Sequence, residues 1–330
     1  MLTIGNIKLD SPLVLAPMAG ISDLPYRILN RRAGCGFAFT EMISATALAY
    51  KSISTLKRLS TTADDRPLGV QIVGNDPELI KRALDTMAEY AFDLVDFNSA
   101  CPVKKITSRG KGAGLLREPQ KLQELLEMIV RSVTVPVTVK IRSGWSKGAV
   151  NAVEVALRAQ DAGVKGLVIH GRTREQRYSG KVDYNIIRQV KEALDIPVIA
   201  SGDALTPELI VKLFNETGCD GVAIARGALG NPWIFRETTA LLKSGTAAPR
   251  PDVHEIMQTM KEHLTSAIAF SGEKIGVLQF RKFFSWYTKG LAVRELKLKA
   301  FRATTGDEML RLIDEIKECE FASIPDFHAF

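Results

Sequence analysis

Two stretches, PVIASGD at residues 197–203 and GVAIARG at residues 221–227, decide the fold. Each is a short apolar run, rich in β-branched residues, that ends in glycine and polar or charged side chains. Continuous apolar runs of this length are expected of strands buried on both faces of a parallel sheet. Six runs of the same kind precede them, at residues 13–18, 37–42, 68–73, 94–98, 136–141 and 166–170.

Polar or irregular residues follow all eight runs at the same, C-terminal end, and helical patterns such as 77–90, 119–133, 149–162 and 184–194 lie between them. A doubly wound sheet is the alternative, but it would use only the residues at one switch point. In a (β/α)₈ TIM barrel all strand ends meet at one mouth, where such enzymes place their active site. We therefore predict a barrel. The mouth residues are Pro17, Met18, Ala19, Glu41, Gln71, Asn98, Cys101, Lys140, Arg142, His170, Ser201, Gly202, Asp203, Ala225 and Arg226.

The stretch LKSGTAAPRP, rich in Gly, Ala and Pro, reads as a linker at residues 242–251. From residue 252 onward the pattern is helical and contains no strand-like run. We expect an α/β chain with a catalytic barrel at residues 1–243 and a small all-helical domain at residues 252–330.

Composition restricts the class of protein. Of 330 residues, 46% are apolar and 25% charged, which is typical of globular proteins. The four cysteines are far apart and form neither a CxxC pair nor a Cys/His quartet, so we expect no metal site and no disulfide framework. The first residues, MLTIGNIKLDS, do not resemble a signal peptide, and no apolar run approaches the ~18 residues of a membrane helix. We expect a cytoplasmic monomer without membrane contact.

The basic residues are clustered. The net charge is +7, and residues 281–302 hold seven basic side chains against one acidic one. Residues 303–330 hold two basic side chains against seven acidic ones, so the helical domain is polarised. The loop at residues 104–117 has five basic side chains and no acidic one, and residues 172–181 have a net charge of +3. An ordinary solvated surface could explain any single patch, but three together favour a partner that carries phosphates. Lys297, Lys299 and Arg302 are our candidates for contacts with these phosphates.

The mouth residues favour a flavin. Glycines 202 and 227 follow the last two strands, where many barrels bind a phosphate with backbone N–H groups, and Arg226 adds a positive charge. These glycines could also be simple tight turns. Lys140 needs an anionic partner, which could be a flavin ring or only Glu41 or Asp96. Gln71 can both donate to and accept from a ring edge, whereas His170 could be a hydrogen-bonded core residue. One phosphate site and these donors fit flavin mononucleotide, FMN.

Cys101 lies in the segment NSACPVKK, on a loop stiffened by the following proline. A free cysteine is by default a small buried hydrophobic residue, but this setting favours a reactive role. A thiol of ordinary pKa is protonated at neutral pH and can donate a proton. The adjacent Lys104 and Lys105 would lower that pKa, and the sequence leaves the balance open.

Several segments, spread over the whole barrel in order, resemble the tRNA-dihydrouridine synthases of bacteria. They are APMAGISDLPYR at 16–27, Gln71, DFNSACPVKKI at 96–106, VKIRSGW at 139–145, HGRT at 170–173, ASGD at 200–203 and ARGALGNPWIF at 225–235. The resemblance implies an FMN enzyme that uses NADPH, with NADH as the alternative reductant, to reduce the 5,6 double bond of a tRNA uridine.

By motif position the resemblance also assigns roles to residues. Cys101 would be the catalytic acid, and Asn98 and Arg142 would lie at the substrate. Two departures stand out, because Ala100 and Ala225 occupy positions where the family usually has glycine. The alternatives are a barrel flavoenzyme acting on a free small molecule, such as a dihydropyrimidine or dihydroorotate dehydrogenase, and an RNA-binding protein with a vestigial flavin. The FMN-binding residues would be Pro17, Met18, Ala19, Gln71, Lys140, His170, Ser201, Gly202, Asp203, Ala225 and Arg226.

Overall fold

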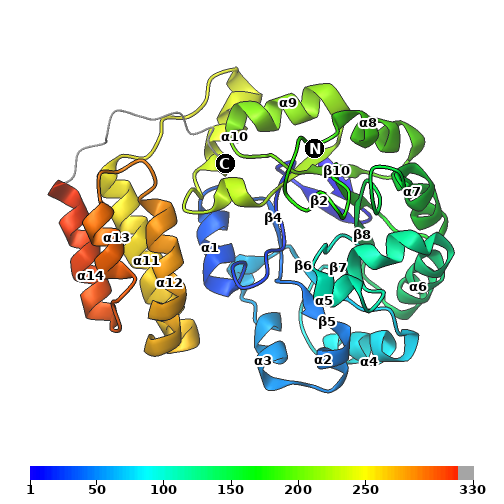
Figure 1. The fold of residues 1–330 in the computed structure, drawn as a ribbon, viewed down its shortest axis with the longest axis horizontal. Helices are drawn as coiled ribbons and strands as arrows, with labels where there is room; N and C mark the ends of the chain where they lie inside the picture. Colours follow the sequence, from blue (N-terminus) through cyan, green and yellow to red (C-terminus); the bar gives the residue numbers. More distant parts are fainter. Residues whose placement is uncertain (319–330) are drawn as a thin grey trace.

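The computed structural model describes residues 1–318, and its centre is a closed parallel barrel (Figure 1). The eight apolar runs each form a strand of it, and closure comes from pairing of the last strand with the first. The predicted (β/α)₈ barrel is therefore confirmed. Its strands are β3 (Leu13–Leu15), β4 (Phe37–Phe39), β6 (Leu68–Val73), β7 (Leu94–Asn98), β8 (Val137–Arg142), β9 (Leu167–His170), β10 (Val198–Ser201) and β11 (Gly221–Ile224).

Helices surround the strands, as Figure 1 shows. Two of them begin where the sequence indicates, because Asp76 and Thr206 accept hydrogen bonds from the backbone N–H groups of Leu79 and Leu209 and each precedes a proline. The surrounding helices are α1 (Leu24–Arg32), α4 (Pro77–Met87), α6 (Pro119–Ser132), α7 (Ala152–Asp161), α8 (Tyr184–Ala193), α9 (Pro207–Thr217) and α10 (Ile234–Ser244).

Short elements at the mouth were not predicted from the sequence. They are too short to show a helical period, which needs at least two or three turns. The strand β5 and two helices fill the connection between β4 and β6, and one helical turn follows β7. They are β5 (Ile43–Ser44), α2 (Ala45–Ala49), α3 (Ile53–Leu56) and α5 (Lys104–Thr107), with 3₁₀ turns at Lys57–Leu59, Ala63–Asp65, Gly112–Arg117 and Arg226–Ala228.

An antiparallel hairpin of β1 (Leu2–Ile4) and β2 (Ile7–Leu9) closes the end of the barrel at which the strands begin. Leu2, Ile4 and Leu9 are buried in one cluster with side chains of the barrel interior. A Cβ at Gly221 would lie 2.9 Å from Leu2, so glycine is required for this close approach. The hairpin blocks this end, and the opposite end is the one open to ligands.

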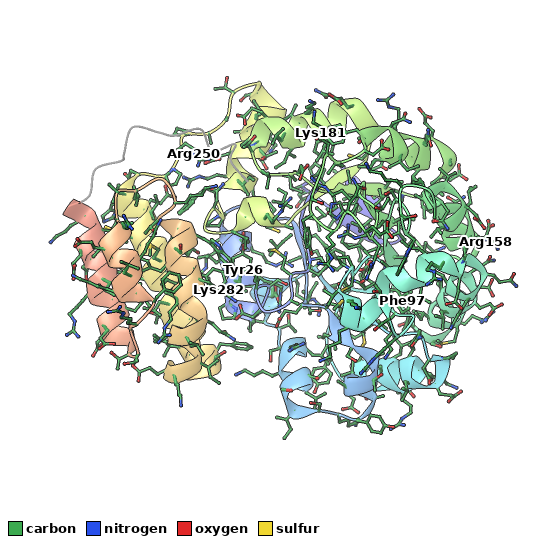
Figure 2. All side chains as sticks on the ribbon, viewed as in Figure 1. Tyr26, Phe97, Arg158, Lys181, Arg250 and Lys282 are labelled. Atoms are coloured by element: carbon green, nitrogen blue, oxygen red, sulfur yellow. The ribbon has the colours of Figure 1, made fainter. Side chains whose placement is uncertain are left out.

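The C-terminal helices pack against α1 beside the barrel: α11 (Val253–Ser271), α12 (Glu273–Tyr287), α13 (Arg294–Ala300) and α14 (Gly306–Asp314), followed by a 3₁₀ turn at Glu315–Glu318. We call residues 253–318 the helical segment. The ring of Tyr26 on α1 lies 5.9 Å from that of His263 and 5.4 Å from that of Phe283. Figure 2 shows Tyr26 and Lys282 at this junction. The remainder of the predicted domain, residues 319–330, and Cys319 lie outside the described residues.

No helix among residues 1–318 is long and apolar enough to cross a membrane. The same part of the chain contains no group of three or more His, Cys, Asp or Glu side chains arranged to hold a metal ion.

Candidate active site

A cavity of about 610 Å³ opens at the C-terminal ends of the strands. It brings together the predicted catalytic cysteine, the residues predicted to bind FMN, and Asn98 and Arg142. Met42, Tyr178 and Leu229 also line it and were not predicted. The predicted residues in its wall are Pro17, Met18, Ala19, Gln71, Asn98, Cys101, Lys140, Arg142, His170, Ser201, Gly202, Asp203, Ala225 and Arg226.

A hydrogen-bond network fixes the amide of Gln71 in the floor of the cavity. Its Nε2 donates to Asp96 Oδ2 at 2.7 Å, and its Oε1 accepts from Asn98 Nδ2 at 2.8 Å. Asp96 also accepts from Thr138 Oγ1 at 2.7 Å. Burial raises the pKa of Asp96 to about 6, and the hydrogen bonds of Thr138 and Gln71 oppose that rise. This network leaves the Gln71 side chain a single orientation at the cavity.

Lys140 extends from β8 into the same floor. Its Nζ is buried and has no hydrogen-bond partner among the described residues. The alternative, that it pairs with Glu41 or Asp96, therefore finds no hydrogen bond to support it. Burial lowers the pKa of Lys140 to about 8, the charge of Arg142 acts in the same direction, and Asp96 opposes it. An unpaired buried ammonium group is costly, so this position favours an anionic or electron-rich ligand.

The loop that carries Cys101 is held from both sides. Asn98 Oδ1 accepts from the backbone N–H groups of Ala100 at 3.1 Å and Cys101 at 2.8 Å. The Arg142 guanidinium donates to the Ala100 carbonyl at 2.7 Å and to the Thr173 carbonyl at 3.0 Å. Burial raises the pKa of the Cys101 thiol above its usual 9.0, with a Val103 hydrogen bond and the Arg142 charge opposing. A pKa above 9.0 keeps the thiol protonated at neutral pH, and Lys104 and Lys105 are not among the groups that shift it.

The turn after β10 passes close to the His170 ring and requires glycine. Gly202 and Asp203 have successive positive φ angles of +110° and +54°. A Cβ at residue 202 would lie 2.6 Å from the His170 ring, so both the angle and the space require glycine. Burial, followed by the nearby Arg142 and Lys140 charges, lowers the pKa of His170 well below its usual value, so its ring is neutral.

Two arginines converge on Asp203 beside this turn. Arg172, which is 2% exposed, donates to both carboxylate oxygens at 2.9 and 2.6 Å. Arg226 donates to Oδ1 at 3.0 Å. The Asp203 carboxylate thus neutralises part of the positive charge of the two arginines, and it holds the Arg226 guanidinium at the cavity wall. Arg172 was not predicted as a site residue, because the sequence does not show which charges pair across loops.

The sequence profile of one family, described as "Dihydrouridine synthase (Dus)", matches residues 14–320. The tRNA-dihydrouridine synthase B of Pseudomonas aeruginosa is 39% identical over 327 residues, which cover 99% of this chain and 95% of that protein. The proteins of the same name in Xanthomonas axonopodis pv. citri and Vibrio cholerae are 36% and 37% identical, covering 98% and 94% of this chain and 97% of each relative. The chain belongs to the dihydrouridine synthase family.

Solved structures of lower identity share the fold. Histamine dehydrogenase from Rhizobium sp. 4-9 is 13% identical with a TM-score of 0.57, covering 80% of this chain and 50% of that one. A 2-naphthoyl-CoA reductase is 11% identical with a TM-score of 0.59, covering 72% and 51%. At this identity the likeness concerns the barrel alone.

The two alanines that depart from the family pattern fit their positions. Among residues 1–318, the non-glycine residues with positive φ are Lys51, Arg177 and Asp203, so neither Ala100 nor Ala225 needs glycine. Ala225 has a φ of −112°. Neither departure removes a polar group from this dihydrouridine synthase cavity.

The three predicted RNA contacts lie away from the cavity, on α13 and just after it. Lys299 Nζ is 3.6 Å from Glu315, and both side chains are largely exposed. Lys297 is half-buried, whereas Arg302 is exposed. Their contact with RNA therefore stays a prediction.

Proposed function

We propose that the protein is a tRNA-dihydrouridine synthase that reduces the 5,6 double bond of tRNA uridines, with FMN as cofactor and NADPH as reductant. The observation that supports it most is one cavity that is lined by the Cys101 thiol, by the buried and unpartnered Lys140 Nζ, and by the turn at residues 201–203 with Arg226.

The residues present fit FMN. The unpartnered Lys140 Nζ can bind the electron-rich edge of an isoalloxazine ring, and the fixed Gln71 amide offers both a donor and an acceptor. The turn at residues 201–203 and the Arg226 side chain can hold a single phosphate group. Pro17, Met18 and Ala19 would supply an apolar wall for the ring, and the absence of a second Gly-rich fingerprint in the sequence favours FMN over FAD.

Bound reduced FMN would supply the hydride that adds to C6 of uracil. Cys101 then donates its proton to C5, where the negative charge of the enolate is shared with O4. Asn98 and Arg142 hold the loop so that the thiol faces the cavity, and both act by positioning. The target base must leave its stack to reach a cavity at the bottom of the barrel mouth.

The exposed basic residues would bind the RNA backbone. On α13, Arg294 and Lys297 share one face with the exposed apolar side chains of Leu298 and Phe301. Lys299 lies on another face, where it is paired with Glu315. We therefore favour Arg294, Lys297 and Arg302 as the phosphate contacts of the helical segment. We keep the boundary between this segment and the barrel at residues 244–251.

We also propose that the protein acts as a cytoplasmic monomer. Cytoplasmic tRNA is the substrate that this assignment requires.

The test begins with the purified protein. It should be yellow, release FMN, and form dihydrouridine, measured by mass spectrometry, in tRNA that lacks this modification when NADPH is supplied. A yellow protein that leaves tRNA unchanged but reduces a free pyrimidine would instead support a small-molecule flavoenzyme. A protein that binds tRNA but cannot be loaded with flavin would support an RNA-binding role.

A further inference from the structure

A second pocket, of about 480 Å³, lies at the same end of the barrel as the catalytic cavity. We call it the basic pocket, and it is formed by the loops that follow β7, β8 and β9. Among the described residues that line it, three are cationic and one is a carboxylate. The residues that matter below are Lys104, Thr107, Arg117, Glu118, Trp145 and Arg174.

The walls of the basic pocket are rigid. The backbone N–H of Arg174 donates to Gly144 at 2.9 Å, and that of Glu175 donates to Trp145 at 3.1 Å, so the loops after β8 and β9 are joined. The Arg174 guanidinium lies 4.6 Å from the centre of the Trp145 ring, and that of Arg117 lies 5.0 Å from it. The indole thus holds two guanidinium groups at defined positions.

Protein carboxylates do not neutralise the cationic side chains of this pocket. Arg174 Nη2 donates to Thr107 Oγ1 at 2.9 Å, but its buried Nε has no hydrogen-bond partner among the described residues. Glu118 is 3.5 Å from Lys121, which lies outside the pocket. The pocket is therefore rich in positive charge and suited to a ligand with several negative oxygens.

The recessed shape of the basic pocket bears on which kind of phosphate it binds, a backbone phosphodiester of RNA or a terminal phosphomonoester. The backbone phosphates of folded RNA lie on a convex surface, and each carries one negative charge. A recess with three cations matches a terminal phosphomonoester, which carries close to two negative charges at neutral pH. Its size suits a single nucleotide.

The helix α5 separates the basic pocket from the catalytic cavity. Lys105 and Ile106 line the cavity, whereas Lys104 and Thr107 line the basic pocket. One helix is about 10 Å wide. A dinucleotide, built from two nucleosides joined by a pyrophosphate, is longer than that and can reach from the cavity over α5.

We propose that the basic pocket binds the 2′-phosphoadenosine end of the nicotinamide dinucleotide, so that its nicotinamide reaches the catalytic cavity. The pocket then selects NADPH over NADH, because only NADPH carries the additional phosphomonoester. This inference rests on the proposed function, which supplies the need for a reductant.

The experiment compares Arg174→Gln and Arg117→Gln with wild-type holoenzyme in anaerobic flavin reduction by NADPH and by NADH. We expect the second-order rate constant for NADPH to fall about 10- to 100-fold, the worth of one charged hydrogen bond, while that for NADH stays unchanged. Arg109→Gln is the matched control, since Arg109 is an exposed arginine of the same loop that does not line the pocket. Because Arg117 is itself exposed, its variant should fold even if the Arg174 variant does not.

Calorimetry gives a second measurement that does not depend on turnover. Adenosine 2′,5′-bisphosphate should bind the wild type more tightly than adenosine 5′-monophosphate, and Arg174→Gln should remove the difference. Equal loss with NADPH and NADH, no preference in the wild type, or a defect confined to tRNA binding would overturn the proposal, the last by assigning the pocket to RNA. A wild type that forms no dihydrouridine with either reductant would instead contradict the proposed function.

Discussion

The burial of Cys101 determines over which pH range its thiol can donate a proton. Because burial raises the pKa above 9.0, the thiol stays protonated through neutral pH and loses its proton only in alkaline solution. A cysteine at an exposed site beside two lysines would lose its proton at a lower pH. The residue is thus suited to act as an acid rather than as a nucleophile.

Replacing Cys101 by alanine should separate the two halves of the reaction. Dihydrouridine formation should fall by about 10²–10⁴, the usual contribution of a general acid. Reduction of the flavin by NADPH should remain near the wild-type rate, because no proton from Cys101 is needed there. Rapid-mixing measurements of each half-reaction test this. An equal decrease in both would indicate that the thiol has only a structural role.

The pH profile supplies an independent check on the same residue. In the wild type, the rate of uridine reduction should be flat through neutral pH and decrease as the pH rises above 9, as the thiol deprotonates. The rate of flavin reduction measured over the same range should not show this decrease. A profile that decreased toward acidic pH instead would contradict the role of the thiol as acid.

Lys140 makes flavin binding depend on pH in a predictable direction. Its pKa in the empty site is about 8, and an anionic ligand favours the charged form. FMN affinity should therefore be constant below pH 8 and weaken as the pH rises above it. Titration of flavin-free protein with FMN at several pH values measures this. Lys140→Met should bind FMN more weakly at neutral pH and should lose the pH dependence, whereas a retained dependence would point to another group.

Strand-end residues such as Lys140 and Gln71 could be predicted from the sequence, because an apolar run identifies the strand and its end identifies the mouth. Arg172 and Tyr178 could not. Arg172 meets Asp203 across two loops, 31 positions apart in the chain, and nothing in the spacing of charged residues identifies such a pair. Asn98 lines the cavity, and its Oδ1 also accepts hydrogen bonds from the backbone of its own loop, so its predicted substrate contact stays a prediction.

At the scale of elements, long periodic segments were predicted within a few residues of their ends, whereas α2, α3 and α5 were missed. Each of these helices has four or five residues. They are stabilised by packing at the mouth rather than by a repeating apolar face, and so leave no periodic signal in the sequence.

The turn after β10 is sensitive to a single methyl group. Gly202→Ala would place a Cβ 2.6 Å from the His170 ring at a backbone angle that other residues rarely adopt. We expect the variant to fold less stably by about 1–3 kcal/mol and to lose most of its FMN. Gly148→Ala is the control, since nothing lies within 4 Å of the added methyl group there. Flavin content and thermal unfolding compare the two, and a yellow Gly202→Ala protein of normal stability would contradict the expectation.

The two faces of α13 should differ in their contribution to tRNA binding. Arg294→Gln and Lys297→Gln together should reduce the slope of log affinity against log salt by about 0.7–0.9 for each phosphate that the variant no longer binds. Lys299→Gln is the matched control on the same helix, because that lysine is paired with Glu315. FMN content should stay unchanged in all variants. If Lys299→Gln changed the slope as much as the other two, the assignment of the faces would be wrong.

At the scale of the whole molecule, the barrel and the helical segment share one continuous hydrophobic core. The junction around Tyr26, His263 and Phe283 is completely or almost completely buried. Although the sequence suggests two domains separated by a linker, this packing indicates that they unfold together. The linker composition gives the boundary between them, but it contains no information on how much surface they bury against each other.

Phe283→Ala tests this coupling. Removing a buried phenylalanine costs about 3–5 kcal/mol, and we expect the loss to lower the midpoint of a single unfolding transition. Leu278→Ala on the same helix is the control, because that side chain is 57% exposed. Calorimetry with flavin loss followed in parallel is the measurement. Two separate transitions, with flavin retained through the first, would show that the helical segment unfolds by itself.

The hairpin of β1 and β2 places a demand on protein synthesis. Gly221, against which Leu2 packs, is made 219 positions after Leu2. At ordinary elongation rates this delay is roughly 10–45 s. Throughout that time β3 has neither its β11 partner nor the closed barrel around it, so its edge and the apolar face of the hairpin are exposed on the nascent chain. The β1–β2 hairpin, which closes one end of the barrel, therefore needs protection of its apolar face until the last barrel strand has been made.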